Sequence, residues 1–282
     1  MTSVRSGFTP DDVLALSPEG KIAVVCTTDS EGRPHLSMLS SLLALSANQM
    51  ALGEFCVGHS KSYMQDRREV GFFIMTLDRR IWGGAARWTG LTREGPVYQQ
   101  FNEKPMFRYN SYFGINTVHF FDLISLDQRG TLPLAKTAAG VLSSLPLRLG
   151  GLAGRGEVMN SWTRKFLARP DVLKFAGFVS SDGVPRVEPV LEATSLGSGH
   201  VLVPEFPWSS ALRTIQPGDP VAILGLSMNM EMVLVRGAYR PHRFPGGGLA
   251  SIAVDFVYNS MPPCHGQIYP PLPLEAVAEF RL

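Results

Sequence analysis

The sequence predicts a mainly β protein with short helices, built from two similar units that follow one another along the chain. Three observations lead to this prediction. The stretch Lys21–Ser41 (KIAVVCTTDSEGRPHLSMLSS) has a second version at Lys174–Leu191 (KFAGFVSSDGVPRVEPVL). Glycine (28) and proline (21) are frequent, which is typical of chains with many turns and short strands. The strands and helices expected after each version also come in the same order, as in an internal repeat.

Both versions of the repeated stretch predict a β-hairpin. Each has an apolar, β-branched run, then Asp and Gly, then a second extended run. Gly supplies the positive φ of a tight turn, and Pro permits only an extended or edge backbone after it. The alignment has an offset of 153 residues for its first two pairs (174 minus 21) and, after a two-residue deletion, 151 for the next two (183 minus 32): Lys21 with Lys174, Asp29 with Asp182, Gly32 with Gly183, and Pro34 with Pro185.

The first unit is expected to open with a short helix, for which Thr9 or Asp11 is the N-cap. The polar stretch Ser60–Arg68 has few β-formers and predicts a helix that begins near His59. Gly83–Gly84, inside a later strand, indicate a bulge or bend. Apart from a helix at Glu94–Glu103, the other elements are runs typical of strands: Lys21–Thr28, His35–Leu45, Gln49–Cys56, Val70–Leu77, Ile81–Thr92 and Tyr112–Leu126.

A change of character between Asp127 and Pro170 divides the chain. This stretch contains two expected helices and a glycine-rich joint, and it has no counterpart in the repeat. We therefore expect a first unit over residues 1–130, a helical connection over 131–170 and a second unit over 171–282. About six strands and one short helix per unit predict a small, closed or partly open barrel of Greek-key-like order. Two such barrels in one chain predict an intrachain pseudo-dimer.

Composition and motifs exclude several functions. A net charge of +2 is too small to indicate a nucleic acid or a membrane surface as partner. The N-terminus lacks a signal pattern, and no apolar run is long enough to span a membrane. Cys26, Cys56 and Cys264 are odd in number and widely spaced, which favours free thiols in a cytoplasmic protein. No G-x-S-x-G motif, P-loop or G-x-G-x-x-G after a strand supports a hydrolase, an NTPase or a Rossmann enzyme.

The order of elements resembles the FMN-binding split-barrel family, the pyridoxamine 5′-phosphate oxidase-like proteins. The resemblance is carried by TTDSEGRPHLSMLS, LGEFCVG and HSKSYMQDRREVGFFIMTL in the first unit. It implies a flavin between the two barrels, FMN or a deazaflavin, with its phosphate held after the third strand. It does not imply the vitamin B6 reaction, since Ser37 and Leu42 stand where those oxidases have phosphate-binding Arg and Lys. Ala211–Leu212 replaces Ser60–Lys61 in the second unit, which is therefore expected to cover the site.

The candidate cofactor residues gather around the predicted helix start. Hydroxyl and ammonium donors beside a helix N-terminus form an anion site, so Ser60 and Lys61 are the first phosphate candidates. Structural roles remain open: a solvated helix start, a surface histidine, a solvated arginine pair, or core packing for the tryptophan. The complete candidate set is His35, Ser37, Ser40, His59, Ser60, Lys61, Arg67 and Trp88. The sequence predicts neither a catalytic side chain nor a metal site.

The function expected from these observations is that of an FMN-binding flavoprotein that exchanges electrons or hydride with a small-molecule redox substrate. The flavin would perform the redox step, and the protein would orient it. The chain is also a candidate homodimer. One alternative is a binding module for haem or another planar ligand on the same fold. A second alternative is a structural, dimer-forming domain.

Overall fold

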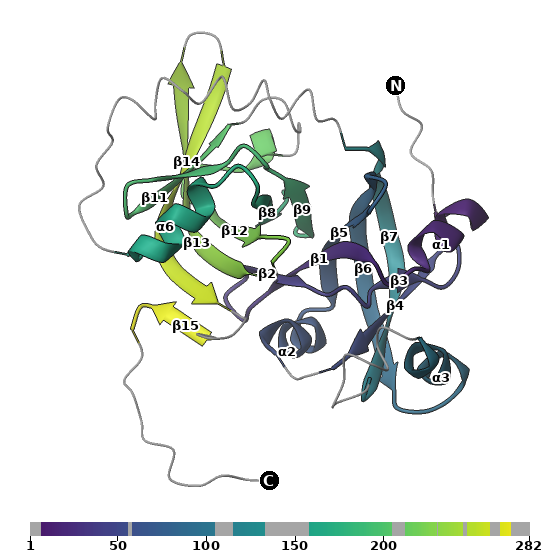
Figure 1. Ribbon diagram of the computed structural model, residues 1–282. Coiled ribbons are helices and arrows are strands. Elements are labelled where there is room, and N and C mark those ends of the chain that lie inside the picture. The colour runs from purple at the N-terminus through teal and green to yellow at the C-terminus, as the bar shows by residue number, and fades with distance from the viewer. Residues whose placement is uncertain are drawn as a thin grey trace, which may run out of the picture.

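The protein is mainly β, with two antiparallel sheets and a few short helices (Figure 1). The computed structural model describes residues 7–55, 58–104, 115–132, 158–204, 212–229, 231–244, 247–259 and 266–271. This confirms the predicted fold class. Among these residues, no strand pairing joins the two ends of either sheet into a closed barrel.

The first sheet contains the strands of the first unit in the order β2-β1-β5-β6-β7-β4-β3. Helix α2 (His59–Asp66) follows β4, and α3 (Pro96–Glu103) precedes β7, as the sequence predicts. The strand bounds are β1 Lys21–Thr28, β2 Pro34–Met38, β3 Leu43–Ala44, β4 Gln49–Glu54, β5 Glu69–Thr76, β6 Arg80–Thr92 and β7 Thr117–Thr131. The predicted irregularity at Gly83–Gly84 is confirmed as a register shift between β6 and β7.

The second sheet repeats this order, as β9-β8-β12-β13-β14-β11-β10. A further strand, β15 (Gly266–Tyr269), pairs with β14 and has no equivalent among the described strands of the first sheet. A single turn of 3₁₀ helix, Leu212–Thr214, stands where the first unit has α2. The strand bounds are β8 Leu173–Val179, β9 Pro185–Pro189, β10 Thr194–Leu196, β11 His200–Pro204, β12 Pro220–Leu226, β13 Met232–Phe244 and β14 Gly247–Asn259.

The strand registers correct the alignment proposed from the sequence. Thr28 pairs with Pro34 as Val179 pairs with Pro185, so the offset is 151 in both strands (179 minus 28; 185 minus 34). The pairings of β5 with β6 and of β12 with β13 give the same value (221 minus 70; 237 minus 86). The offset is therefore constant from β1 to β6. No deletion is needed, and the residue that matches Lys174 is Ala23.

One predicted strand is broken in both units. His35–Leu45 forms β2 and β3 instead, separated by a turn in which the Leu42 amide donates to the Leu39 carbonyl at 3.0 Å. The second unit has the same turn, with the Ala193 amide donating to the Val190 carbonyl at 2.9 Å. Neither turn contains glycine, proline or asparagine, and the only residue-level sign is the weak one of Ser40 and Ser41 in the first.

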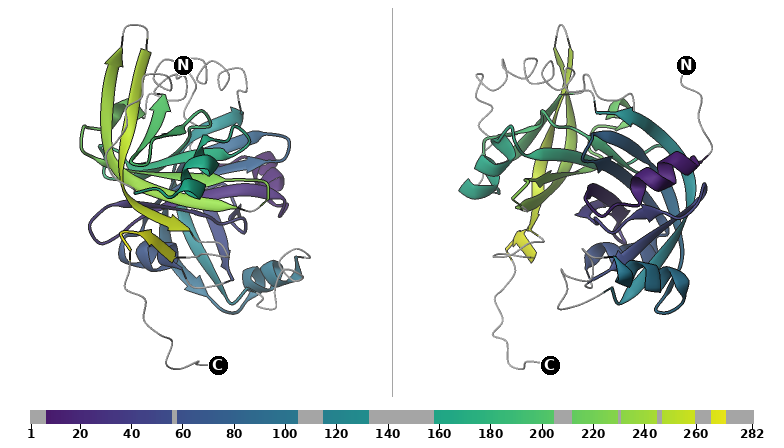
Figure 2. Two further views of the ribbon diagram at one scale, coloured as in Figure 1. Left: turned by 60° about the vertical axis from the view of Figure 1, so that its left-hand side comes forward. Right: turned by 45° about the vertical axis from the view of Figure 1, so that its right-hand side comes forward.

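Each sheet curves around its own core, and a third core joins the two sheets. Residues from both ends of the first sheet, such as Val25 in β1 and Ala44 in β3, belong to one cluster, and the second sheet has its own. A separate cluster combines Phe73 of β5 with Phe175 of β8, whose rings lie 5.4 Å apart. The two units thus pack side by side through β1, β2 and β5 against β8, β9 and β12 (Figure 2). This contact surface has the arrangement expected of an intrachain pseudo-dimer.

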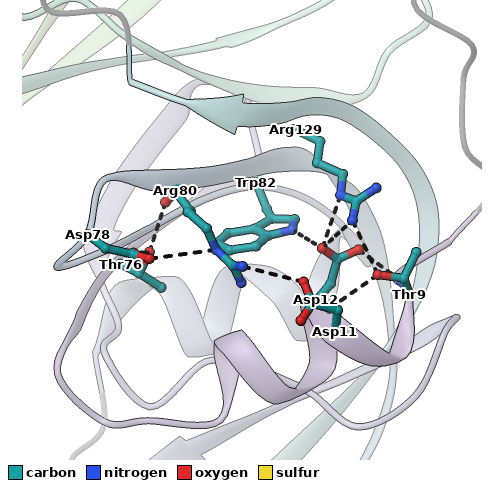
Figure 3. A network of polar contacts seen from close by, with 8 residues as sticks. All are labelled: Thr9, Asp11, Asp12, Thr76, Asp78, Arg80, Trp82 and Arg129. Atoms are coloured by element: carbon teal, nitrogen blue, oxygen red, sulfur yellow. Dashed lines mark hydrogen bonds and ion pairs between the residues drawn. The ribbon is translucent and has the colours of Figure 1, made fainter.

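One further helix packs against each of the two units. Helix α1 (Pro10–Leu16) begins at the N-cap Thr9, whose side chain forms a capping box with Asp12. The buried Asp12 carboxylate also accepts hydrogen bonds from Trp82 Nε1 at 2.9 Å and Arg129 Nε at 3.0 Å, which fixes the helix to β6 and β7 (Figure 3). Helix α6 (Ser161–Ala168), in the predicted connection, packs into the core of the second unit.

Some sequence predictions lie outside the described residues. These include the helix at Leu134–Leu142, the glycine-rich joint, Cys56 and Cys264. Among the described helices, none is long and apolar enough to span a bilayer.

Candidate cofactor site at the junction of the two units

The N-terminus of α2 brings together three of the predicted cofactor residues. Ser37 of β2 and Ser60 of α2 lie with their hydroxyl oxygens 2.6 Å apart. Ser60 and Lys61 are both buried, at 3% and 8% exposure. The N-cap is Gly58, and no side chain caps the helix. A Cβ atom added to Gly58 would lie 3.9 Å from Lys61 Nζ, so the ammonium group lies close to the helix start.

Four rings from both units pack beside this helix start. His59 stacks on Tyr63, one turn along α2, with centroids 5.7 Å apart. His35 of β2 meets both rings edge-on, at 5.8 and 5.7 Å. Tyr258 of β14 closes the group from the second unit, 5.4 Å from His35 and from His59. Phe256 is stacked on Tyr258, with the two planes inclined by 7°.

The buried His35 is neutral at physiological pH. Burial, followed by the nearby charges of His59 and Arg236, lowers the pKa of His35 to about 3. A neutral imidazole has one donor and one acceptor nitrogen, so it can orient a polar ligand without adding charge.

A charged group from both units borders the rings. Asp29, in the turn after β1, accepts a hydrogen bond from Arg33 Nε at 2.8 Å and one from Arg236 Nη1 of β13 at 3.4 Å. Burial alone would raise the pKa of Asp29, but the hydrogen bonds and charges of the two arginines outweigh burial and lower it. The Arg236 guanidinium also lies 4.5 Å from the centre of the Phe256 ring. Arg33 also pairs with Glu31 at 2.9 Å, so this border carries two arginines and two carboxylates.

The structure does not bring the remaining predicted residues into this group. Ser40 is half-buried in the turn between β2 and β3, and its neighbour Ser41 donates to the Gly53 carbonyl at 2.5 Å. The exposed Arg67 donates to the Ser30 carbonyl at 2.8 Å. It also lines a cavity of about 320 Å³ between α2 and the hairpin turn of the second unit.

Trp88 belongs to a polar chain inside the first unit. Its Nε1 donates to His119 Nδ1 at 3.1 Å, and His119 Nε2 lies 2.8 Å from Glu54 Oε2. Since Nδ1 accepts the indole hydrogen, the ring hydrogen of a neutral His119 is on Nε2 and is donated to Glu54. This chain ties β4, β6 and β7 together and accounts for Trp88 without a cofactor.

Sequence reasoning missed the residues that join the site across the units. Tyr63 lies on the predicted helix, one turn after His59, and that spacing places both on one face. Arg236, Phe256 and Tyr258 come from the second unit, more than 200 positions away from Asp29 and His35. The internal repeat is a signal that two like units pack together, but it does not tell which residues of β13 and β14 reach the site.

No protein-family model matches the chain, and no curated protein matches it. Among solved structures, it is similar to an FMN-binding protein from Syntrophomonas wolfei (12% identity, TM-score 0.35, 44% of this chain and 86% of that one). It is also similar to HupZ from Group A Streptococcus (13%, 0.34, 45% and 99%). A pyridoxamine 5′-phosphate oxidase-like protein from Lactobacillus delbrueckii gives 12%, 0.35, 44% and 96%. These likenesses each span less than half of the chain, and such identities say nothing about what it binds.

Proposed function

We propose that this protein is a flavoprotein that binds FMN at the junction of its two units. The observation that carries the proposal is the pairing of an anion-compatible helix start with a group of rings supplied by both units. The hydroxyls of Ser37 and Ser60 and the ammonium of Lys61 offer donors beside the uncapped N-terminus of α2. A phosphate monoester is a fitting ligand for such a set, because helix N-termini and charged donors both favour anions.

The rings beside the helix start suit a planar group. His59, Tyr63 and Tyr258 have flat apolar faces with polar edges, the type of surface that binds aromatic heterocycles. The neutral His35 and the border of Asp29, Arg33 and Arg236 supply polar contacts around them. When bound, a flavin supplies one- or two-electron chemistry, while the chain holds and orients the flavin and sets the charge around it. The protein would thus be an oxidoreductase with a small-molecule redox partner.

The first test is the absorption spectrum of the purified protein, with the mass of any compound released by heating. A flavin double band and released FMN are expected. A deazaflavin would differ in both spectrum and mass. A colourless protein that also fails to take up added FMN would refute the proposal.

The phosphate contacts can be tested separately. In titrations of the apoprotein, FMN should bind at least about tenfold more tightly than riboflavin, equivalent to about 1.4 kcal/mol, because riboflavin lacks the phosphate. Lys61→Gln should remove most of this difference. Lys165→Gln, on the exposed face of α6, is the matched control and should not change it. Equal affinities for FMN and riboflavin in the unmodified protein would contradict the assigned phosphate site.

Haem is the second candidate, favoured by one observation. The imidazole of His59 is exposed, next to His35 and two tyrosines, and imidazole is a common axial ligand of haem iron. A haem protein should have a Soret band that His59→Ala abolishes and Lys61→Gln leaves unchanged. The opposite response of the two variants identifies FMN.

The constant register offset also supports an origin of the two units by tandem duplication. Strand order and register agree from β1 to β6 without an insertion.

A further inference from the structure

The two units place two equivalent positions on opposite sides of their interface. Strand β2 of the first unit packs on β8 and β12, as β9 of the second packs on β1 and β5. At the offset of 151, Arg186 matches His35 (186 minus 35), and Glu188 matches Ser37 (188 minus 37). Strands β7 and β14 align at an offset of 131, since Met50 pairs with Phe121 and Val201 with Ile252 (252 minus 121).

With this second offset, residues of β7 can be matched to residues of β14. Ser125 corresponds to Phe256 (256 minus 125), since they pair with Ala85 and Arg236. Asp127 lies at the same offset from Tyr258 (258 minus 127), at the register shift beside Gly83–Gly84, where the strand pairing itself matches Tyr258 with Gln128. Every ring at the candidate cofactor site that comes from β2 or β14 therefore has a polar or charged counterpart at the second position.

Those counterparts contact one another. Arg186 donates from Nη1 to Ser125 Oγ at 2.9 Å and to the Asp127 carboxylate of the first unit. Its Nη2 donates to Asp182 Oδ2 at 2.9 Å, and its Nε donates to Ser180 Oγ at 3.2 Å. All three guanidinium nitrogens are thus used within the protein. The arginine side chain is 18% exposed, so the group is largely covered.

The second position also lacks the features that suit a phosphate. Glu188 is buried at 8% exposure where the candidate site has the hydroxyl of Ser37. Leu212 replaces the ammonium of Lys61, at the same offset (212 minus 61). The group around Arg186 has two aspartates and one arginine and is net negative, whereas Arg33 and Arg236 are balanced by Asp29 and Glu31 at the candidate site. An anionic ligand is repelled from the second position.

We infer that the chain holds one cofactor, although its fold has two equivalent positions. The second position is closed by the Arg186 group, which consists of Arg186, Ser180, Asp182, Ser125 and Asp127 and acts as a clamp that joins the two units. The cofactor part of this inference rests on the proposed function, with FMN as the ligand. The clamp part is independent of any ligand, because its contacts join β9 of one unit to β7 of the other.

Titration of the apoprotein with FMN, followed by native mass spectrometry, tests the cofactor part. One equivalent per chain is expected, and the double variant Ser60→Ala, Lys61→Ala should weaken its binding at least about tenfold. Arg186→Met should leave the affinity of this one site within about twofold. Two equivalents would overturn the inference while leaving the proposed function standing, and so would a second equivalent that the double variant does not weaken. No uptake of FMN would overturn the cofactor part together with the proposed function.

A double-mutant cycle tests the clamp. Arg186→Met and Asp127→Asn should each lower the urea midpoint, and the double variant should lower it by less than the sum of the two shifts. Arg164→Met, on the exposed side of α6, is the control and should leave the midpoint unchanged. Additive shifts, or no shift for Arg186→Met, would overturn the clamp even if one FMN is bound.

Discussion

Replacing Gly71 by alanine should separate the two units, because this residue lies where their backbones meet. Gly71 is in β5, and a Cβ added to it would lie 2.6 Å from the Pro185 carbonyl oxygen and 2.9 Å from Arg186 Cα. Both atoms belong to the backbone of β9 in the second unit, so a side-chain rotation cannot relieve the overlap. The strand must move away, and the apolar contact between the units must loosen.

The size of this effect can be worked out against a matched variant. Overpacking a close contact costs about 1–3 kcal/mol. Removing a glycine also restricts the unfolded chain, which returns about 0.4–1 kcal/mol where alanine fits. Gly90 of β6 is such a place, since a Cβ added there meets nothing within 4 Å. Gly71→Ala should therefore be less stable than Gly90→Ala by about 2 kcal/mol.

Urea unfolding followed by circular dichroism measures this difference through the midpoint and slope of each transition. The FMN affinity of Gly71→Ala should fall as well, because Tyr258 and Arg236 reach the candidate site from the second unit. If the two alanine variants prove equally stable, the backbones of the two units do not meet closely at Gly71. The candidate site at their junction would then lack the contact that positions it.

Three further predictions follow from burial and charge. Unfolded His35 takes up a proton below about pH 6.5 and folded His35 only near pH 3, so stability should fall with pH below 6.5, by about 2 kcal/mol at pH 5. His35→Gln should flatten the dependence of stability on pH in this range. A smaller dependence of the same sign, caused by the lowered pKa of His200, should remain. An unchanged slope in this variant would contradict the burial of His35. Asp12→Ala should cost about 2–3 kcal/mol in urea unfolding, because it leaves the buried Trp82 Nε1 without its acceptor and removes the ion pair with Arg129. Asp11→Ala, at an exposed position, should cost less than about 0.5 kcal/mol. Burial between the units raises the pKa of Cys26 to about 12, which keeps the thiol unreactive. Peptide mapping after iodoacetamide treatment at pH 8 should find Cys26 unmodified in the folded protein and modified in urea. Rapid labelling of the folded protein would contradict the burial of Cys26 between the units.

Local patterns in the sequence predict most single elements of the fold. The run Lys21–Thr28 becomes β1 with the bounds expected, and Thr9 caps the first helix, because apolar runs and capping residues act through near neighbours. The turn at Leu39–Leu42 was missed because its only turn-type residues are Ser40 and Ser41, which are a weak signal inside an apolar run. Apolar residues on both sides of a break read as one continuous strand.

The candidate site likewise contains residues that local sequence patterns predict and residues that they do not. Ser60 and Lys61 were found from the helix start that follows the third strand, a local feature. Arg236 and Tyr258 were not, because their contact with the site depends on how two distant units pack. Trp88 was predicted to meet the cofactor, yet its indole donates to His119, a partner 31 positions away that no local pattern indicates.

The interface itself explains how one fold can carry two different positions. Residues matched at the offset of 151 are apolar on both sides of the core that joins the units: Ile22 and Leu173, Val24 and Phe175, Leu36 and Val187, Phe73 and Leu224, Met75 and Leu226, and Ile81 and Met232. This apolar centre holds the two sheets together without regard to the polar residues around it, since burial of apolar surface is non-directional. The surrounding positions are then free to differ. On one side they form rings and an uncapped helix start, and on the other an arginine saturated by carboxylates and hydroxyls. Because the apolar centre supplies the stability of the junction, a change that removes only the Arg186 side-chain contacts should weaken the protein far less than Gly71→Ala, which forces the backbones of β5 and β9 apart.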